Sequence, residues 1–530
     1  MLIKVSSASN SGLETIGVDV EVNLANRGLP AFEIVGLPSK AVDESRERVK
    51  TAIVNSSIEF PTKKITVNLA PADIPKEGSF YDLPIAIGIL ASVMSYELPK
   101  NSLFFGELSL DGTLRHTKGA LLLSLFAKER GIENIFVPKA SANEAAIVKG
   151  VRVYPVESIN QLVAYLLSQI LIEPAKYREA NCSGGSYPNG HRRTASTGEA
   201  EFDMAEILGQ EQAKRAIEIS AAGGHNFFMI GSPGSGKTML ARALPDILPA
   251  LIERESLEVT KIYSASGRIP PEGSLIKIRP FRAPHHTISQ VGLIGGGSRP
   301  QPGEISLAHR GVLFLDEFNE FPRGVLEALR QPMEDGHLTI SRSRERVDYP
   351  SRFMLVAAAN PCPCGYLYHP KKSCTCTQRE IEKYKKRVSG PLLDRIDLYI
   401  EVPVVDIKEL AKGSGDSYPN GHRRTVPTSV EIKARVEKAR TVQKNRFKEK
   451  EIYTNTEMKN ADIKKHCYLS GEVKQLLLQA GMAFQLSARS YFKMIKVART
   501  IADLEDSGDI GVSHMAEALQ YRPRVQIRDI

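Results

Sequence analysis

Apolar positions along the chain follow two periods, one typical of strands and one typical of helices. Up to about residue 165 the two alternate, with strand-like runs in KITVNLAPAD (ending at residue 73) and NIFVPKAS (134–141). The segment AVDESRERVKTAIVNS (41–56) places its apolar side chains on one helical face. LPIAIGILASVM (83–94) is apolar throughout, but it is too short to span a bilayer and predicts a buried helix.

Further along, the periods separate into an α/β region and a helical region. Strand-like runs ending in polar residues alternate with helices over residues 203–405, whereas LSGEVKQLLLQAGMAF and SARSYFKMIKVARTIADLED carry apolar faces of period 3.6. Polar stretches rich in Gly, Ser and Thr lie between the regions and are typical of linkers. The predicted order is a front α/β domain, a linker, an α/β core, a linker insertion and a helical domain: 1–170, 171–202, 203–405, 406–430 and 431–530.

Both linkers contain the same nine residues, SYPNGHRRT, at 186–194 and 417–425. Pro-Asn-Gly is turn chemistry, and Gly and Ser flank both copies. Neither copy offers a residue that the chemistry described below requires. We interpret the repeat as a tolerated linker insertion, and the alternative is a flexible His-Arg-Arg contact with DNA.

The strongest chemical signal is FFMIGSPGSGKTMLARAL (227–244), in which an apolar strand leads through a glycine-rich loop into a helix. Backbone N–H groups of such a loop close around phosphate oxygens, and the helix N-terminus adds positive potential. Lys237 is expected to reach the β- and γ-phosphates of ATP, and the Thr238 hydroxyl to bind Mg²⁺. The predicted nucleotide-binding residues are Gly231, Ser232, Pro233, Gly234, Ser235, Gly236, Lys237 and Thr238.

Two later strands end in residues that would complete an ATPase site. The apolar strand within RGVLFLDEFNEF (310–321) ends in Asp316 and Glu317. Asp316 is a predicted Mg²⁺ ligand, and Glu317 would polarise the attacking water. The apolar strand that opens FMLVAAANPCPCG ends in Asn360, whose amide could touch the γ-phosphate. Three strand ends in this order predict a parallel sheet with nucleotide at its carboxyl edge.

Four of the six cysteines lie within fifteen residues, in the loop 362–376. Disulfides are unexpected in a reducing compartment, so the cluster Cys362, Cys364, Cys374 and Cys376 predicts a metal site. Two C-x-C pairs are a weaker zinc signal than two C-x-x-C pairs, but four thiols with Gly365 at the turn favour tetrahedral Zn²⁺. One structural zinc per chain is expected, because four thiolates leave no open coordination position.

Composition and charge narrow the class of partner. Of 530 residues, 42% are apolar and 25% charged, as in an ordinary soluble globular protein. The N-terminus MLIKVSSASN lacks the pattern of a secretory signal, so a cytoplasmic location without membrane insertion is expected. The net charge is +9, yet residues 1–160 carry −1, so the basic character belongs to the rest of the chain. That distribution fits a polyanion such as nucleic acid, although a solvated basic surface is the simpler alternative.

Several long motifs resemble one family. GQEQAKRAIEISAAGGHNFFMIGSPGSGKTMLA, RPFRAPHHTIS, GEISLAHRGVLFLDE, NPCPCGY and SGPLLDRIDLYIEVP are similar to the magnesium-chelatase-like AAA+ ATPases of the ComM/YifB type, over nearly the whole chain. The resemblance implies that Asn360 is the sensor-1 residue, Arg395 an arginine finger acting on a neighbouring subunit's ATP, and Arg489 the sensor-2 arginine of the helical lid. It also implies a homo-hexameric ring. From the residues alone, Arg489 is equally a surface residue that opens a helix after Ser487.

Two segments fit the pore of such a ring. IRPFRAPHHTISQVGLIGGG (278–297) would be an insertion in the second core helix. HLTISRSRERVDYPSRF (337–353) alternates like a hairpin and places Arg342, Arg344 and Arg346 on one face, where they could grip DNA phosphates. The alternative is an exposed edge hairpin that its charges protect from aggregation.

The front domain resembles the Lon protease domain, which implies an α/β fold of the ribosomal S5 domain 2 type. In DIPKEGSFYDLPIAIGIL the slot of the Lon serine falls on Phe80, and the best alignment puts Leu121 in the slot of the Lon lysine. A serine nucleophile requires an adjacent base. Since neither slot holds the required residue, the domain is predicted to be non-proteolytic.

The resemblance implies an ATP-dependent ring motor acting on single-stranded or branched DNA. Its expected activity is helicase action or branch migration of recombination intermediates during natural transformation. One alternative is a chelatase motor subunit that drives metal insertion into a porphyrin, but we expect such subunits to lack the Lon-like front domain, and no D-x-S-x-S motif is present. Another is a protein-remodelling ATPase, in which Phe281 would grip an extended chain.

Overall fold

A computed structural model of the chain describes residues 2–25, 29–72, 76, 78–178, 202–269, 273, 275–297, 300–341, 346–367, 369–405, 426–450 and 452–522. Both copies of SYPNGHRRT lie outside the described residues, and so do Arg342 and Arg344. The chain divides into two compact units. The first takes its described residues from Met1–His191, Ser256–Ile276 and Ser341–Asp348, and the second from Arg192–Glu255, Lys277–Ile340 and Tyr349–Ile530.

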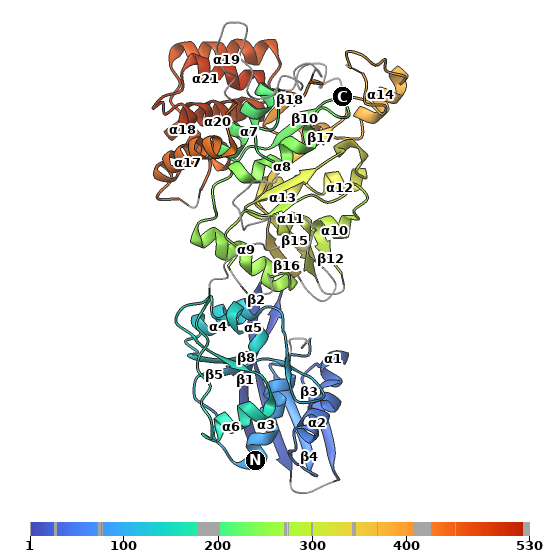
Figure 1. The fold of residues 1–530 in the computed structure, drawn as a ribbon, viewed down its shortest axis with the longest axis vertical. Helices are drawn as coiled ribbons and strands as arrows, with labels where there is room; N and C mark the ends of the chain where they lie inside the picture. The colour runs from blue at the N-terminus through green and yellow to red at the C-terminus, as the bar shows by residue number, and fades with distance from the viewer. Residues whose placement is uncertain are drawn as a thin grey trace. The chain divides into compact units, whose positions relative to one another are not determined.

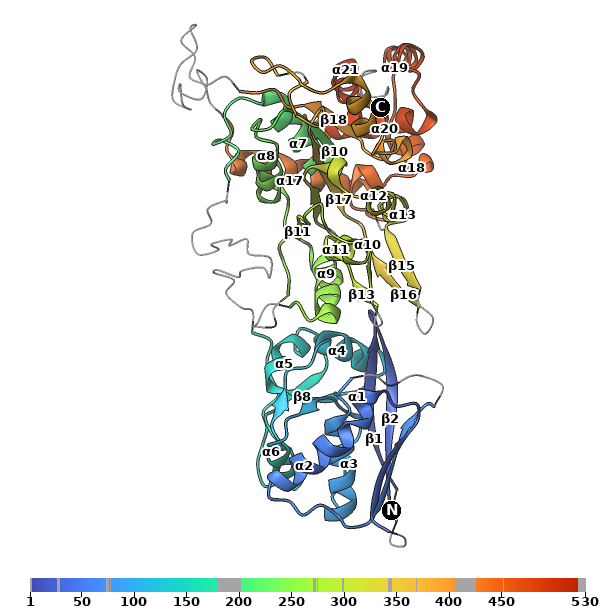
Figure 2. The same cartoon turned by 90° about the vertical axis from the view of Figure 1, so that its right-hand side faces the viewer.

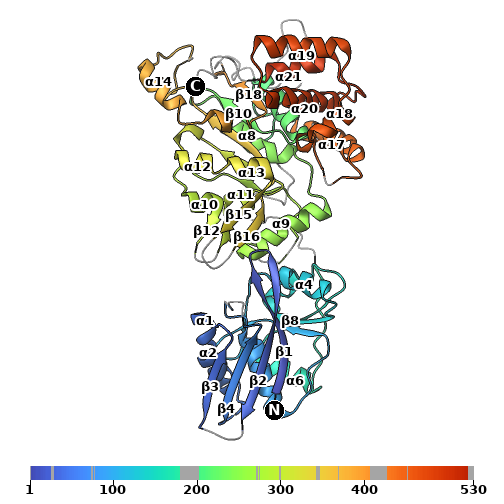
Figure 3. The same cartoon turned by 180° about the vertical axis from the view of Figure 1, so that it is seen from behind.

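The first unit is built on a mixed four-stranded sheet, visible from behind in Figure 3. Its strand order is β1-β2-β4-β3, antiparallel except between β3 and β4. The predicted strand ending at residue 73 is β4, and its inward side chains alternate with outward ones. The predicted buried helix is α3, whereas segment 41–56 forms two helices, α1 and α2, that separate at Glu44. The bounds are β1 Leu2–Ser11, β2 Glu14–Ala25, β3 Ala31–Val35, β4 Lys64–Ala70, α1 Lys40–Asp43, α2 Ser45–Asn55 and α3 Asp82–Met94.

A second, parallel sheet of the first unit has the order β5-β8-β9, and helices complete the unit. Phe80 stacks on Phe105 with ring centroids 4.7 Å apart, and Leu121 is fully buried on α4. The two positions aligned with the Lon dyad therefore hold side chains of the apolar core. The bounds are β5 Ser102–Phe104, β6 Glu107–Leu108, β7 Leu114–Arg115, α4 Ala120–Glu129, β8 Asn134–Pro138, α5 Lys139–Ala145, β9 Arg152–Val156 and α6 Ile159–Leu166.

The second unit is built on a five-stranded sheet of order β11-β14-β17-β10-β18, in which every pairing is parallel. Because side chains alternate across a strand, each strand supplies two cores. Phe227 and Met229 of β10 join the core that holds helices α7 and α8, and Phe228 joins the core around α12. Figure 2 shows α8 on one side of β10 and β17, with α12 and α13 on the other. The bounds are α7 Glu211–Gly223, β10 Phe227–Ile230, α8 Lys237–Ile247, β11 Phe281–Arg282, β14 Val312–Leu315, α12 Arg323–Glu327, α13 Arg330–Asp335, β17 Met354–Ala359 and β18 Leu398–Glu401.

Smaller elements complete the described chain (Figure 1), and most of α9 and of β16 belongs to the first unit. Two further two-stranded sheets are β12-β13 and β15-β16, of which the second is the hairpin that the sequence predicts. The bounds are α9 Glu253–Ser266, α10 Gln290–Ile294, β12 Gly295–Gly296, β13 Gln301–Pro302, α11 Glu304–Leu307, η1 Phe318–Glu320, β15 His337–Ser341, β16 Arg346–Pro350, α14 Gln378–Lys385 and α15 Gly390–Leu393.

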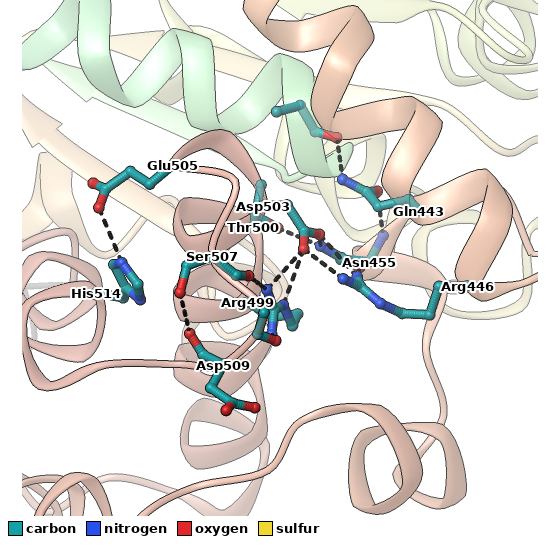
Figure 4. A network of polar contacts seen from close by, with 12 residues as sticks. Gln443, Arg446, Asn455, Arg499, Thr500, Asp503, Glu505, Ser507, Asp509 and His514 are labelled. Atoms are coloured by element: carbon teal, nitrogen blue, oxygen red, sulfur yellow. Dashed lines mark hydrogen bonds and ion pairs between the residues drawn. The ribbon is translucent and has the colours of Figure 1, made fainter.

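The C-terminal helices form a lid around a buried polar network (Figure 4). The fully buried Asp503 carboxylate accepts hydrogen bonds from Arg446 (2.8 Å), Arg499 (3.0 Å) and Asn455 (2.8 Å). Thr500 extends the network to the core, because its hydroxyl lies 2.8 Å from Nε2 of His225. The bounds are α17 Ser429–Arg446, η2 Asn455–Glu457, α18 Asn460–His466, α19 Gly471–Ala483, α20 Ala488–Leu504 and α21 Val512–Gln520.

These elements confirm the predicted fold class: a mixed α/β front domain, a parallel AAA+-like core and a helical C-terminal domain. The helix 83–94 that the sequence assigns to the interior is almost wholly buried. Among the described helices, none combines the length and apolar character that a bilayer crossing demands.

The buried network makes a stability prediction. Asp503→Ala should lower the free energy of unfolding of the lid by about 3–5 kcal/mol, because two arginines would lose their buried counter-charge. Hydrogen exchange of amides in α17 and α20 measures this loss. The control is Lys438→Ala, which breaks the exposed Lys438–Asp506 pair (2.9 Å) and should cost about 1 kcal/mol or less. Equal effects of the two substitutions would contradict the conclusion that the buried network around Asp503 stabilises the lid.

Candidate active site

The parallel register brings three sequence-predicted segments to one edge of the sheet. Ile230 of β10 pairs with Ala359 of β17, and Leu315 of β14 pairs with Ala357. The residues that follow these strands therefore emerge at the carboxyl edge, where α/β sheets bind ligands. Gly231 at the start of the phosphate loop donates its N–H to the carbonyl of Ala359 at 3.2 Å.

The phosphate loop has the conformation that its glycines make possible. Gly234 and Gly236 adopt φ of +79° and +90°, the left-handed region that favours glycine. Helix α8 then begins at Lys237, whose Nζ donates to the carbonyls of Gly231 (2.6 Å) and Ser232 (3.0 Å). Burial lowers the pKa of Lys237, and the nearby carboxylates of Asp316 and Glu317 oppose that shift. The ammonium is therefore held among acceptors, where a phosphate would bind it strongly.

Asn360 and Asp316 converge on the same loop. Nζ of Lys237 lies 3.3 Å from Oδ1 of Asn360, and the Thr238 hydroxyl donates to Oδ2 of Asp316 at 2.7 Å. Thr238 and Asp316 thus present two oxygen ligands side by side. Oxygen donors in this number suit Mg²⁺, which keeps several waters and takes further ligands from substrate phosphates. The residues present therefore fit Mg²⁺, the cation that accompanies ATP in phosphoryl transfer.

Glu317 directly follows Asp316 and has an unusual backbone. Its φ is +51°, in the left-handed region that a non-glycine residue seldom occupies, and its N–H donates to Oδ1 of Asp316 at 2.9 Å. The carboxylate is half exposed, and its Oε2 lies 3.0 Å from Nδ1 of His286. An accessible carboxylate beside the phosphate loop can accept a proton from water.

The cysteine loop touches the phosphate loop. Gly365 adopts φ of +81°, and a Cβ added there would lie 2.5 Å from Cδ of Pro233. Only a glycine therefore allows the two loops to approach so closely at this position, which is five residues after Asn360. The cysteine loop and the phosphate loop thus support each other.

The four cysteines form a compact cluster at the end of β17. Their sulfur atoms all lie within 4.8 Å of one another, including 3.7 Å between Cys362 and Cys374. A tetrahedral zinc ion with bonds of about 2.3 Å places its sulfur ligands about 3.8 Å apart, so the cluster fits that ion. Backbone N–H groups of Tyr366 and Thr375 lower the pKa of the Cys364 thiol to about 5, whereas burial raises that of the Cys362 thiol to about 12, so the geometry of the cluster carries the metal assignment.

The two predicted catalytic arginines lie together, but at the opposite edge of the sheet. Glu334 pairs with both Arg395 and Arg489. The carbonyl of Arg395 accepts from the Asn226 side chain at 3.1 Å, and Asn226 precedes the strand that the phosphate loop follows. Both arginines line a cleft of 1120 Å³ between the amino edge of the sheet and the lid helices. The structure therefore does not bring them to the phosphate loop of their own chain.

Arg489 lies where the sequence pattern predicts, at the start of a helix. Ser487 caps α20 by accepting the N–H of Ser490, and Arg489 is the second helical residue. The Arg489 side chain remains partly exposed beside Glu334. The Glu334 carboxylate holds the guanidinium in the lining of the cleft.

The predicted DNA-contacting hairpin is described only in part. Arg346 is the first residue of β16 and is exposed, while Val347 and Tyr349 point inward. This alternation agrees with the period that the sequence shows. Tyr349 donates its hydroxyl to the carbonyl of Pro300 at 2.9 Å, which anchors the base of the hairpin.

Sequence reasoning missed two residues of the site. His286 stands in the quoted motif RPFRAPHHTIS, and Glu334 in QPMEDG, but neither belongs to a spacing that signals contact with a distant residue. Their partners, Glu317 and Arg395, lie 31 and 61 positions away. For His286, the only available signal in the sequence was a histidine close to a proline.

Three segments of the chain match families that are named for one enzyme subunit. Residues 203–410 match the family described as magnesium chelatase, subunit ChlI, and residues 20–141 that described as subunit ChlI of Mg-chelatase. Residues 427–522 match the family described as magnesium chelatase, subunit ChlI C-terminal. We expected chelatase subunits to lack the front domain. Because the match at 20–141 also carries the chelatase subunit's name, that expectation was wrong, and the front domain by itself does not exclude a chelatase.

Some similar proteins match this chain over nearly their full length, and others over about half of their length. Competence protein ComM of Haemophilus influenzae is 40% identical over 99% of this chain and 98% of its own length. YifB of Escherichia coli is 40% identical over 96% of this chain and 95% of its own length. The magnesium-chelatase 38 kDa subunit of Rhodobacter capsulatus is 26% identical over 30% of this chain and 50% of its own length.

The geometry predicts that loss of ATP hydrolysis and loss of ATP binding can be separated by substitutions at this site. Glu317→Gln should keep ATP binding and lower the hydrolysis rate by about 10²-fold or more, because the amide cannot accept the proton of water. Lys237→Ala should instead weaken ATP binding by at least about tenfold, since a charge-assisted hydrogen bond to phosphate contributes about 1.5–3 kcal/mol. Equilibrium binding of a fluorescent ATP analogue and single-turnover hydrolysis measure the two effects. Hydrolysis at the wild-type rate by Glu317→Gln would show that another residue is the base.

Proposed function

This chain belongs to the ComM/YifB family of AAA+ ATPases related to the magnesium chelatase subunit ChlI, and from that premise we propose that it is a ring-shaped motor acting on DNA. The observation that carries the proposal is the convergence of Lys237, Thr238, Asp316 and Asn360 at one sheet edge, with both arginines at the other. A subunit with the two halves of an ATP site on opposite edges is complete only beside a neighbour.

Hydrolysis follows from the roles of these residues. The loop N–H groups and Lys237 bind the phosphates of ATP, and Thr238 and Asp316 would hold the Mg²⁺ that neutralises them. Glu317 takes a proton from the attacking water while the water oxygen bonds to the γ-phosphorus. The bond from the γ-phosphorus to the bridging oxygen breaks, and ADP leaves with that oxygen. Asn360 positions the γ-phosphate and the water.

Arg395 and Arg489 act on the neighbouring subunit's nucleotide. Developing negative charge on the γ-phosphoryl group is stabilised by arginines that a second subunit supplies. The position of both arginines beside the cleft, away from their own phosphate loop, supports action in trans. A closed homo-hexameric ring gives every subunit such a neighbour.

DNA is the proposed substrate, and three observations support it. The chain beyond residue 160 is strongly basic, and Arg346 is exposed on β16 of the hairpin. A relative that is 40% identical over almost the whole chain is named a competence protein. We therefore assign helicase or branch-migration activity on single-stranded or branched DNA, in the context of natural transformation.

The protein-remodelling alternative loses its one candidate residue. Phe281 lies in strand β11, is only partly accessible, and stacks on Phe314 with ring centroids 6.0 Å apart. A side chain in this position belongs to the sheet and cannot grip an extended polypeptide. The chelatase alternative rests on the family name, and the assay below distinguishes it from the DNA motor.

A zinc ion in the cysteine cluster would brace the catalytic loops. The contact between Gly365 and Pro233 joins the cluster to the phosphate loop, and Asn360 is two residues before Cys362. Four thiolate ligands make the site structural, because no position is left for water or substrate.

The DNA proposal predicts ATPase stimulation by single-stranded or branched DNA over duplex or no DNA. The triple variant R342A/R344A/R346A should lose most of that stimulation. Its slope of log binding constant against log salt should become shallower by about 2, at about 0.7 per lost phosphate contact. The control K63A/K100A/K149A removes the same charge from exposed lysines of the first unit and should behave as the wild type. If no nucleic acid binds or stimulates the wild type, the DNA proposal fails.

The zinc proposal predicts about one zinc per purified chain by mass spectrometric metal analysis. The double variant C374S/C376S should lose the ion and bind ATP more weakly, since Gly365 would no longer hold Pro233. Cys467→Ala alters a buried lid cysteine and should keep the full zinc content. Pure protein without bound metal would refute the site.

A further inference from the structure

Within the first unit, the turn between β1 and β2 contacts strand β16 of the hairpin. The two strands lie side by side (Figure 2) and pair as far as Ser11 and Glu14, so the turn consists of Gly12 and Leu13. A Cβ added at Gly12 would lie 2.1 Å from Cγ1 of Val347. Val347 is buried, and it belongs to the first unit together with the turn. The Val347 side chain therefore packs against the bare backbone of the turn.

Only a glycine fits at this point of the turn. Gly12 has φ of +59°, in the left-handed region that favours glycine. A separation of 2.1 Å is far inside the contact distance of about 3.5–4.0 Å between carbon atoms. Val347 is β-branched, so it has no flexible stem with which it could give way to an added Cβ. The contact is a close fit between two specific residues.

The turn is held firmly by the front domain. The side-chain amide of Asn10 donates to the carbonyl of Gly119 at 3.2 Å, and the Thr15 hydroxyl donates to Oδ1 of Asn10 at 2.8 Å. Gly119 is the residue that precedes helix α4, and β1 is paired with β2 from Leu2 to Ser11. Strand pairing and a side-chain bridge thus fix the turn on which Val347 packs.

Helix α9 is attached to the same corner of the front domain. Ser264 of α9 donates its hydroxyl to the buried carboxylate of Glu144 at 2.6 Å. The same carboxylate oxygen accepts the N–H of Leu121, near the start of α4, at 3.0 Å. The start of α4 therefore supports the β1–β2 turn through Gly119 and the attachment of α9 through Leu121. Two segments from the core region of the sequence, α9 and β16, are held by one corner of the front domain.

The packing of Val347 determines the direction in which its neighbours on β16 point. Successive side chains of a strand alternate between its two faces. Val347 and Tyr349 are buried on one face, whereas Arg346 and Asp348 are exposed on the other. If Val347 lost its contact with the turn, β16 would keep its anchor at Tyr349 but Arg346 would lose its fixed direction.

We propose that the front domain is the support of the DNA-binding hairpin, and that Gly12, through Val347, is a positioning residue that sets how Arg346 meets a DNA phosphate. The inference rests on the proposed DNA function and gives the non-proteolytic front domain a role in it. DNA affinity then depends on a contact away from the nucleotide site, whereas ATP hydrolysis without DNA does not.

The test combines hydrogen exchange of the full-length protein without DNA and its affinity for a single-stranded oligonucleotide at several salt concentrations. Gly12→Ala should speed exchange of the β16 amides by about tenfold, because overpacking opens the contact. The slope of log binding constant against log salt should become shallower by about 0.7, the value for one phosphate contact on a single strand. ATP hydrolysis without DNA should keep the wild-type rate.

The matched control is Gly131→Ala. Gly131 has φ of +69°, and no heavy atom of the described residues lies within 4 Å of an added Cβ, so this variant has the backbone cost without the clash. It should match the wild type in β16 exchange and in salt slope. Val347→Ala opens the same contact from the hairpin side and should also speed β16 exchange. In that background Gly12→Ala should add little, since the methyl group that it meets is gone.

Three results would overturn the inference. They are equal effects of Gly12→Ala and Gly131→Ala, full additivity of Gly12→Ala and Val347→Ala, and an unchanged salt slope in Gly12→Ala. If the wild type binds no DNA, the proposed function fails, whereas exchange of the β16 amides still decides whether the turn supports the hairpin.

Discussion

The parallel register of β10, β14 and β17 is the constraint on which the site depends. In a parallel sheet all carboxyl ends share one edge, so the segments after these three strands must meet. Each strand is short and buried on both faces, which explains the nearly continuous apolar sequence of FFMI, VLFL and MLVAAA. A slip of one residue would exchange the two cores and carry Asp316 away from Thr238.

The same sheet positions a second group of polar residues at its amino edge. Asn226 joins Arg395 to the start of β10, and the lid covers this edge through the network centred on Asp503. The network is buried and fully hydrogen-bonded at Asp503, so it fixes the orientation of α20 as well as its attachment. Arg489 at the start of α20 thereby meets Glu334, which α13 supplies. One carboxylate thus holds two arginines ready on the face opposite the phosphate loop.

Loops rather than regular elements tune the carboxyl edge. The cysteine loop supports the phosphate loop at Gly365, and the turn after β11 presents His286 to Glu317. Glu317 lies in the left-handed region, where a residue other than glycine is strained and its neighbours must maintain the conformation. Gly365 occupies the same region without strain, because it has no side chain.

The sequence alone determined the elements and much of the chemistry. Strand and helix periods located β4, α3, β10, β14, β17 and the lid helices, because burial on one or both faces leaves its period in the chain. The glycine-rich loop, the acidic pair and the four cysteines carried their chemistry in spacing that is local. The break at Glu44, which divides one predicted helix into two, left no comparable signal.

Contacts between distant segments were decided only by the tertiary structure. The approach of Gly365 to Pro233, of His286 to Glu317 and of Glu334 to both arginines depends on how strands and loops pack, and no period or motif encodes such distances. The position of Arg395 and Arg489 at the amino edge likewise follows from strand direction and lid docking. A sequence records which side chains a segment offers, whereas packing selects which of them meet.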